Sequence, residues 1–216
     1  FSAVDARHMI GTKEISPIDL IDSSIARIEA INSAVNAVVA TDFERARTEA
    51  KKAEDDIMSG AAIGPLHGLP IGAKDLEVTA GLKTTFGSLL YEDNVPEEDQ
   101  RSIAEIRFAG GIVFGKTNTP EFGAGANTKN RVYGATGNPF DPELTCGGSS
   151  GGSAVSLATG MVTLATGSDY GGSLRIPAGF CGVVGFRPSP GTVPNEVRTV
   201  GLNPYSVLGP MGRSVA

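Results

Sequence analysis

The stretch CGGSSGGSAVSLATGMVTLATGSDYGGSLRIPAGFCG, residues 146–182, contains two loops rich in glycine and serine. Between the loops, residues 153–161 predict a helix of small side chains and residues 162–169 predict a strand. Glycine loses much conformational freedom on folding, so it is usually retained where the backbone takes a positive φ or approaches another group closely. The glycines therefore indicate two loops whose backbone takes a positive φ or closely approaches another group.

Upstream of this stretch, residues 1–60 are expected to form an N-terminal helical layer. Ser16 followed by Pro17 is typical of a helix start, because serine caps the first turn and proline fits its first position. One apolar stripe at helical spacing follows, made by Ile18, Ile21, Ile25, Ile28 and Ile31. Residues 42–58 mix charges with alanine and predict an exposed helix.

Residues 61–216 are expected to form the core of an α/β domain. HGLPIGAKDLEVTAG, residues 67–81, predicts a strand that ends in a loop. Residues 101–111 then predict a helix and residues 112–118 a strand, a step typical of a parallel or mixed sheet. The chain starts at Phe1 rather than at methionine, and it stops at GPMGRSVA (209–216) without a stop signal, so both ends look cut. We therefore expect it to be part of one larger domain whose C-terminal portion is absent.

Composition argues against several classes of protein. The net charge is -6, and the lysines and arginines are scattered, so we expect no nucleic-acid partner. No apolar run approaches the roughly 20 residues that span a bilayer, so no membrane partner is expected. Two cysteines are too few for a disulfide framework, which favours the cytoplasm. The two histidines lack metal-ligand spacing, so neither a metal nor another cofactor is expected.

One match to a nucleotide-binding motif is rejected. GGIVFGKT, residues 110–117, satisfies the P-loop pattern. A P-loop needs a strand before it and a helix after it. Here a predicted helix precedes the motif, its centre is a strand-like apolar run, and Pro120 follows too soon for the required helix.

A second match, to the nucleophile elbow of α/β-hydrolases, is also rejected. GGSSG, residues 147–151, satisfies G-x-S-x-G. That fold needs an acid and a histidine later in the chain than the serine. Both histidines of this sequence precede the motif.

Three segments remain, GLPIGAKD (68–75), CGGSSGGSA (146–154) and GSDYGGSLRIPAGFCG (167–182). Together with GKTNTPEFG (115–123) and GFRPSPG (185–191), they resemble the amidase signature family in wording, order and spacing. The resemblance extends over nearly the whole chain. It implies an α/β fold with a mixed, mostly parallel central sheet wrapped by helices, here incomplete at its C-terminus.

The resemblance also implies a catalytic triad. Ser173 would attack the substrate, Ser149 would relay the proton of Ser173, and a neutral Lys74 would receive it. The residue chemistry agrees, because amide hydrolysis needs an activated nucleophile and lysine is the base that remains when histidine is scarce. Neutrality near pH 7 requires the lysine pKa to fall by about 3 units, which full burial can supply. The flanking residues Leu69, Ile71 and Ala73 make that burial plausible.

The second Gly-rich loop is expected to bind the oxyanion. In DYGGS, successive backbone N–H groups would converge on one oxygen, those of Tyr170, Gly171, Gly172 and Ser173. The supporting residues, which hold the two loops, would be Asp169, Arg175 and Ser150. The resemblance further implies a cis peptide bond between Gly148 and Ser149.

We therefore expect an amidase that hydrolyses a carboxylic or aryl amide through an acyl-enzyme on Ser173. Two alternatives remain. One is the glutaminase subunit of a tRNA-dependent amidotransferase, although GFRPSPGTVP (185–194) departs from the KPTYGRVSR wording typical of that subunit. The other is an inactive binding module. The expected partner is a small-molecule amide; the sequence leaves open which amide it is, and whether the protein is a monomer or a homo-oligomer. Tyr170 and Cys146 depart from the commonest family wording and bear on the shape of the acyl pocket.

Overall fold

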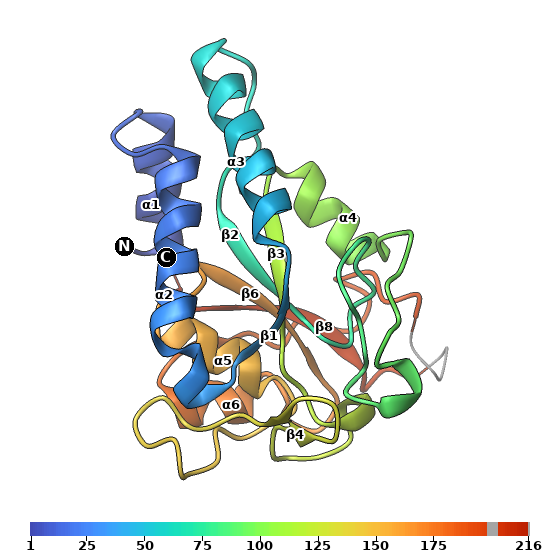
Figure 1. The fold of residues 1–216 in the computed structure, drawn as a ribbon. Helices are drawn as coiled ribbons and strands as arrows, with labels where there is room; N and C mark the ends of the chain where they lie inside the picture. The colour runs from blue at the N-terminus through green and yellow to red at the C-terminus, as the bar shows by residue number, and fades with distance from the viewer. Residues whose placement is uncertain (198–202, 216) are drawn as a thin grey trace.

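The computed structural model describes residues 1–197 and 203–215. Helices pack around one central sheet (Figure 1). The helices are α1 (Ala3–Gly11), α2 (Pro17–Val35), α3 (Phe43–Met58), α4 (Arg101–Phe108), α5 (Gly151–Ala158) and α6 (Arg175–Cys181). The sheet strands are β1 (Val38–Thr41), β2 (Pro70–Lys74), β3 (Ile112–Thr117), β6 (Leu164–Asp169), β7 (Val184–Gly185) and β8 (Val207–Gly212). Shorter elements are β4 (Lys129–Asn130), β5 (Gly134–Ala135), η1 (Leu89–Tyr91) and η2 (Glu121–Gly123).

The sheet is mixed, as the sequence predicts, and its strand order in the described part of the chain is β1-β3-β2-β6-β8-β7. Parallel pairing is confined to the centre, where β2 lies between β3 and β6. The pairs β1–β3, β6–β8 and β7–β8 are antiparallel, so the expectation of a mostly parallel sheet holds only for these central strands. Parallel neighbours need a crossover connection, and α4 and α5 lie in the connections that lead into β3 and β6.

The N-terminal region is helical except for one strand. Ser16 caps α2, as the sequence predicts, and the structure adds a capping box with Asp19. The predicted isoleucine stripe packs into the main core, with Ile21 fully buried. The strand β1 was not expected within residues 1–60. It forms because Asn36 takes a left-handed conformation that ends α2, after which the chain pairs with β3.

The site is positioned by the ends of the central strands. Lys74 is the last residue of β2, and Asp169 is the last residue of its parallel neighbour β6. Because parallel strands end at the same edge of a sheet, these residues and the serines before α5 come together there. No helix in the described ranges 1–197 and 203–215 is long and apolar enough to cross a membrane.

The start of α5 packs so closely that Gly152 has no room for a side chain. A Cβ at this position would lie 2.2 Å from the backbone N of Asn118 and 2.7 Å from the carbonyl O of Ala37. We expect Gly152→Ala to lower the free energy of unfolding by about 1–3 kcal/mol, the usual cost of overpacking, as measured by urea denaturation. Gly179→Ala, in α6, is the matched control, because apart from its chain neighbours and its own helix backbone nothing lies within 4 Å of its Cβ position. It should be neutral or stabilising by up to about 1 kcal/mol. Equal stability of the two variants would contradict the packing.

Candidate active site

The amino group of Lys74 lies among three serine hydroxyls. Its Nζ is 2.7 Å from Ser149 Oγ, 2.9 Å from Ser150 Oγ and 2.8 Å from Ser168 Oγ. Lys74 is fully buried and Ser149 nearly so. The structure thus brings together Lys74, Ser149 and Ser150 from the predicted set, and it adds Ser168.

Burial sets the protonation of Lys74. Removal from water lowers the pKa of Lys74 to about 7, against the opposing influence of Glu77 and Asp169. In a large fraction of the molecules, Lys74 is therefore neutral near pH 7. A neutral amine has two N–H groups and one lone pair, so one of the three hydroxyls around it donates rather than accepts. This is the arrangement that a serine-to-lysine proton transfer requires.

The loop that carries Ser149 has the conformation that the resemblance implies. The peptide bond between Gly148 and Ser149 is cis, which confirms that prediction. Gly147 just before it has a φ of +76°, which favours glycine. The hydroxyl of Thr128 donates to the carbonyl O of Gly147 at 2.8 Å and holds the loop from outside.

Ser173 lies on the same cavity as Ser149. The cavity has a volume of about 470 Å³, and Ser168 and Tyr170 also line it. Ser173 is half-buried, and among the hydrogen bonds of the described chain none joins its hydroxyl to Ser149. Catalytic hydrogen bonds are often long in unliganded proteins and tighten when substrate binds. Ser149 and Ser173 thus line one cavity without a direct hydrogen bond between their hydroxyls.

One of the four amides expected to bind an oxyanion is already engaged. The N–H of Gly172 donates to Asp169 Oδ1 at 2.9 Å, because this loop folds back over the Asp169 carboxylate. In the described part of the chain, no hydrogen bond uses the N–H of Gly171 or Ser173. The predicted set is therefore reduced to Tyr170, Gly171 and Ser173.

Asp169 holds the loop that carries Ser173. Its buried carboxylate accepts hydrogen bonds from the N–H groups of Gly172 and Leu174 and from the guanidinium groups of Arg175 and Arg187. Burial alone would raise the pKa of Asp169, but the bonds from Arg175 and the two amides outweigh it and lower the pKa to about 2. These contacts agree with the supporting role expected of Asp169 and Arg175.

Replacing Asp169 by asparagine should destabilise the protein most above pH 4. The folded-state pKa of about 2 lies below the ordinary value of 3.8, so the carboxylate stabilises the fold above pH 4 and loses that effect as pH falls toward 2. The linkage amounts to about 2 kcal/mol. Urea unfolding of the wild type and Asp169→Asn should therefore differ more at pH 6 than at pH 2. A difference independent of pH would show that the charge is not what holds the loop.

Sequence reasoning missed Ser168, Thr166 and Arg187. Thr166 Oγ1 accepts the backbone N–H of Lys74 at 2.9 Å, two residues before Ser168 on β6. Alternate residues of a strand share a face, so the pair of hydroxyl residues in TGSD was the available signal. Arg187 is the single charged residue of the motif GFRPSPG, and that isolated charge was the available signal.

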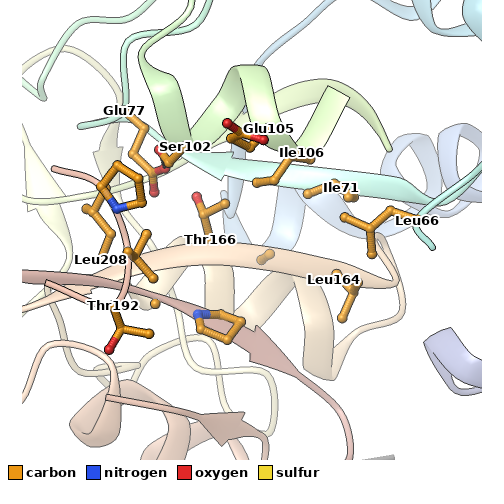
Figure 2. A pocket seen from close by; sticks show the side chains of 15 residues that line it. Leu66, Ile71, Glu77, Ser102, Glu105, Ile106, Leu164, Thr166, Thr192 and Leu208 are labelled. Carbon is orange, nitrogen blue, oxygen red and sulfur yellow. Dashed lines mark hydrogen bonds between the residues drawn. The ribbon is translucent and has the colours of Figure 1, made fainter. Parts of the chain in front are cut away.

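A second cavity lies away from these serines, and Figure 2 shows its lining. It has a volume of about 310 Å³ and is mostly apolar, between α4 and the strands β2, β6 and β8. Glu77 borders it, and burial raises the pKa of that carboxyl. None of Lys74, Ser149 and Ser173 lines this cavity. In the described residues, no three histidine, cysteine, aspartate or glutamate side chains gather as a metal site would require.

Comparison with known proteins agrees with the fold and the family. The Amidase family matches residues 19–216. An acylamidase of Rhodococcus erythropolis is 38% identical over all of this chain and 45% of its own length. A glutamyl-tRNA(Gln) amidotransferase subunit of Bacillus velezensis is 40% identical over 98% of this chain and 44% of its own. The crystal structure of a bacterial aryl acylamidase, an amidase signature enzyme, superposes with a TM-score of 0.93 at 35% identity, covering 99% of this chain and 45% of that one.

The mixed α/β fold of this chain is thus the fold of the amidase signature enzymes. The chain belongs to the amidase signature family. It spans about 45% of the length of the relatives that it matches.

Proposed function

We propose that this chain hydrolyses a carboxylic or aryl amide to an acid and an amine or ammonia, through an acyl-enzyme on Ser173. The observation that carries the proposal is the fully buried Lys74, whose pKa is about 7 and whose Nζ lies 2.7 Å from Ser149 Oγ. Ser149 and Ser173 share one cavity. A base, a relay and a nucleophile are therefore available at one place.

In the acylation step, Ser173 Oγ attacks the amide carbonyl carbon and forms a C–O bond. The proton of Ser173 passes to Ser149, and the proton of Ser149 passes to Lys74 Nζ. The N–H groups of Gly171 and Ser173, and that of Tyr170, stabilise the resulting oxyanion. The C–N bond then breaks as the proton on Lys74 returns through Ser149 to the leaving amine. In deacylation, water replaces the amine and uses the same relay, which releases the acid.

A turnover assay with trapping of the intermediate tests this function. Aliphatic, aryl and peptide amides should be screened for release of amine or ammonia. Intact-mass analysis after a rapid acid quench should show the protein heavier by one acyl group, located on the peptide that contains Ser173. Absence of turnover on every amide, in protein that is folded by circular dichroism, would favour the inactive binding module instead.

A second candidate function is the glutaminase step of a tRNA-dependent amidotransferase. The observation that favours it is the 40% identity to the glutamyl-tRNA(Gln) amidotransferase subunit of Bacillus velezensis. The same triad would serve it, with glutamine as the amide and ammonia as the leaving group. Turnover of glutamine in preference to aryl and aliphatic amides, raised further by a partner protein, would support this candidate over a free-standing amidase.

A further inference from the structure

Two phenylalanines beside the proposed active site take a backbone conformation that is rare for bulky residues. φ is +54° at Phe86 and +52° at Phe122. A large side chain in this left-handed region is unfavourable and persists only where the surrounding structure enforces it. Such residues gather at active sites and at the surfaces that clamp ligands.

Hydrogen bonds tie these two residues to each other and to the strand that carries Lys74. The N–H of Phe122 donates to the carbonyl O of Phe86 at 2.7 Å. Thr85, next to Phe86, donates its hydroxyl to Asp75 Oδ2 at 2.5 Å and its N–H to Asp75 Oδ1 at 3.0 Å. Asp75 directly follows Lys74 and is fully buried. The positions of both backbones are therefore fixed relative to the proposed base.

Tyr91 joins the two rings into a continuous aromatic surface. Its ring meets Phe86 at a centroid distance of 5.1 Å and an angle of 81°, and Phe122 at 6.2 Å and 89°. Both contacts are edge to face, the arrangement that the charge distribution of aromatic rings favours. Yet 42% of Tyr91 and 54% of Phe122 stay exposed. The cluster thus leaves substantial ring area open to a ligand.

The open ring area faces a cavity that adjoins the serine cavity. Phe86, Tyr91 and Phe122 line a space of about 360 Å³. This space and the serine cavity share Phe122 and Ser168 as lining residues. A group bound against the rings is therefore next to the hydroxyls at which the amide bond would be broken.

We propose that Phe86, Tyr91 and Phe122 form a subsite that holds an aromatic ring of the amide substrate. The inference rests on the proposed function, since it places the ring beside the reacting serines. An aromatic ring can extend the edge-to-face series, whereas a cyclohexyl ring of similar size lacks the matching quadrupole. The ring belongs either to the acyl group or to the amine of the substrate, and paired substrates separate these two sources.

Two pairs of substrates measure the preference for an aromatic ring over a cyclohexyl ring. The protein is used in the form that its own organism produces. Benzamide against cyclohexanecarboxamide places the ring on the acyl side, and acetanilide against N-cyclohexylacetamide places it on the amine side. In one pair, the aryl-to-cyclohexyl ratio of kcat/KM should fall by about 2- to 12-fold in Phe122→Leu and in Tyr91→Leu. Differences in intrinsic reactivity cancel, because each pair is compared across variants. The pair that responds identifies the source of the ring.

Tyr91→Phe keeps a ring and should keep the ratio. Phe108→Leu is the matched control, since Phe108 is 90% exposed on α4 and lines neither cavity. The subsite is overturned if the aryl-to-cyclohexyl ratio of kcat/KM changes no more in Phe122→Leu and Tyr91→Leu than in Phe108→Leu, in both pairs. A wild type that hydrolyses none of the four amides counts against the proposed function for these compounds, not against the subsite. Calorimetry of the four compounds with Ser173→Ala then decides the subsite: tighter binding of one aryl member, lost on adding Tyr91→Leu, supports it, and equal binding overturns it.

Discussion

Ser173→Ala should abolish both amide turnover and covalent labelling by a fluorophosphonate probe. The hydroxyl of Ser173 is the expected nucleophile, and loss of the nucleophile in a serine hydrolase triad lowers kcat by about 10⁴-fold or more. The substitution removes one oxygen from a half-buried position, so the fold should be retained. Turnover and in-gel fluorescence, measured on the same preparation, check the two effects together.

Ser206 offers a matched control for that experiment. Ser206 lines the same cavity as Ser149 and Ser173, but its hydroxyl makes no hydrogen bond to Lys74 in the described chain. Ser206→Ala should keep full labelling. Labelling that survives in Ser173→Ala and disappears in Ser149→Ala would assign the nucleophile to Ser149 instead.

Lys74→Ala should reduce kcat/KM by several orders of magnitude, and Lys74→Arg should be nearly as damaging. The relay needs a neutral amine, whereas a guanidinium stays charged at any accessible pH. Burial lowers the pKa of Lys74 to about 7. Wild-type kcat/KM should therefore be low at pH 5.5, rise tenfold per pH unit below the pKa, and level off above about pH 8.

Lys116 is the control for the pH profile, because it is a second fully buried lysine on the neighbouring strand β3. Burial lowers its pKa to about 8, but its Nζ contacts Thr79 Oγ1 and the carbonyl O of Glu77 rather than the serines. Lys116→Met should therefore keep the rise near pH 7, even if stability falls. A profile that loses this rise in Lys116→Met would assign the titration to the wrong lysine, and an active Lys74→Arg would show that only positive charge is needed.

The sequence was sufficient to anticipate the central contact between Lys74 and Ser149, because short ordered motifs carry both residues. The sequence was not sufficient to predict that the N–H of Gly172 is bound to Asp169. Whether an N–H group is free depends on where the Asp169 side chain turns, and that is a property of the folded loop. Ser168 was read only as part of a strand, since its contact with Lys74 depends on the register of β2 against β6.

The missed strand and the aromatic cluster have a similar explanation. β1 has four residues, too few for alternation to distinguish a strand from the turn between two helices. Phe86, Tyr91 and Phe122 come from two separate turns, and no periodicity relates them. Their meeting is set by tertiary contacts, including the bond between the backbones of Phe86 and Phe122.

The groups proposed for chemistry and those proposed for recognition differ in how freely they can vary. Lys74 and Ser168 lie on central strands with hydrogen-bonded neighbours on both sides, so a change there disturbs the whole sheet. The rings of Tyr91 and Phe122 lie on short 3₁₀ turns and are partly exposed. The two ring side chains can therefore be exchanged with less disturbance to the sheet than Lys74 or Ser168. A mutant library built to change the substrate range belongs at positions 86, 91 and 122, with the strand ends left untouched.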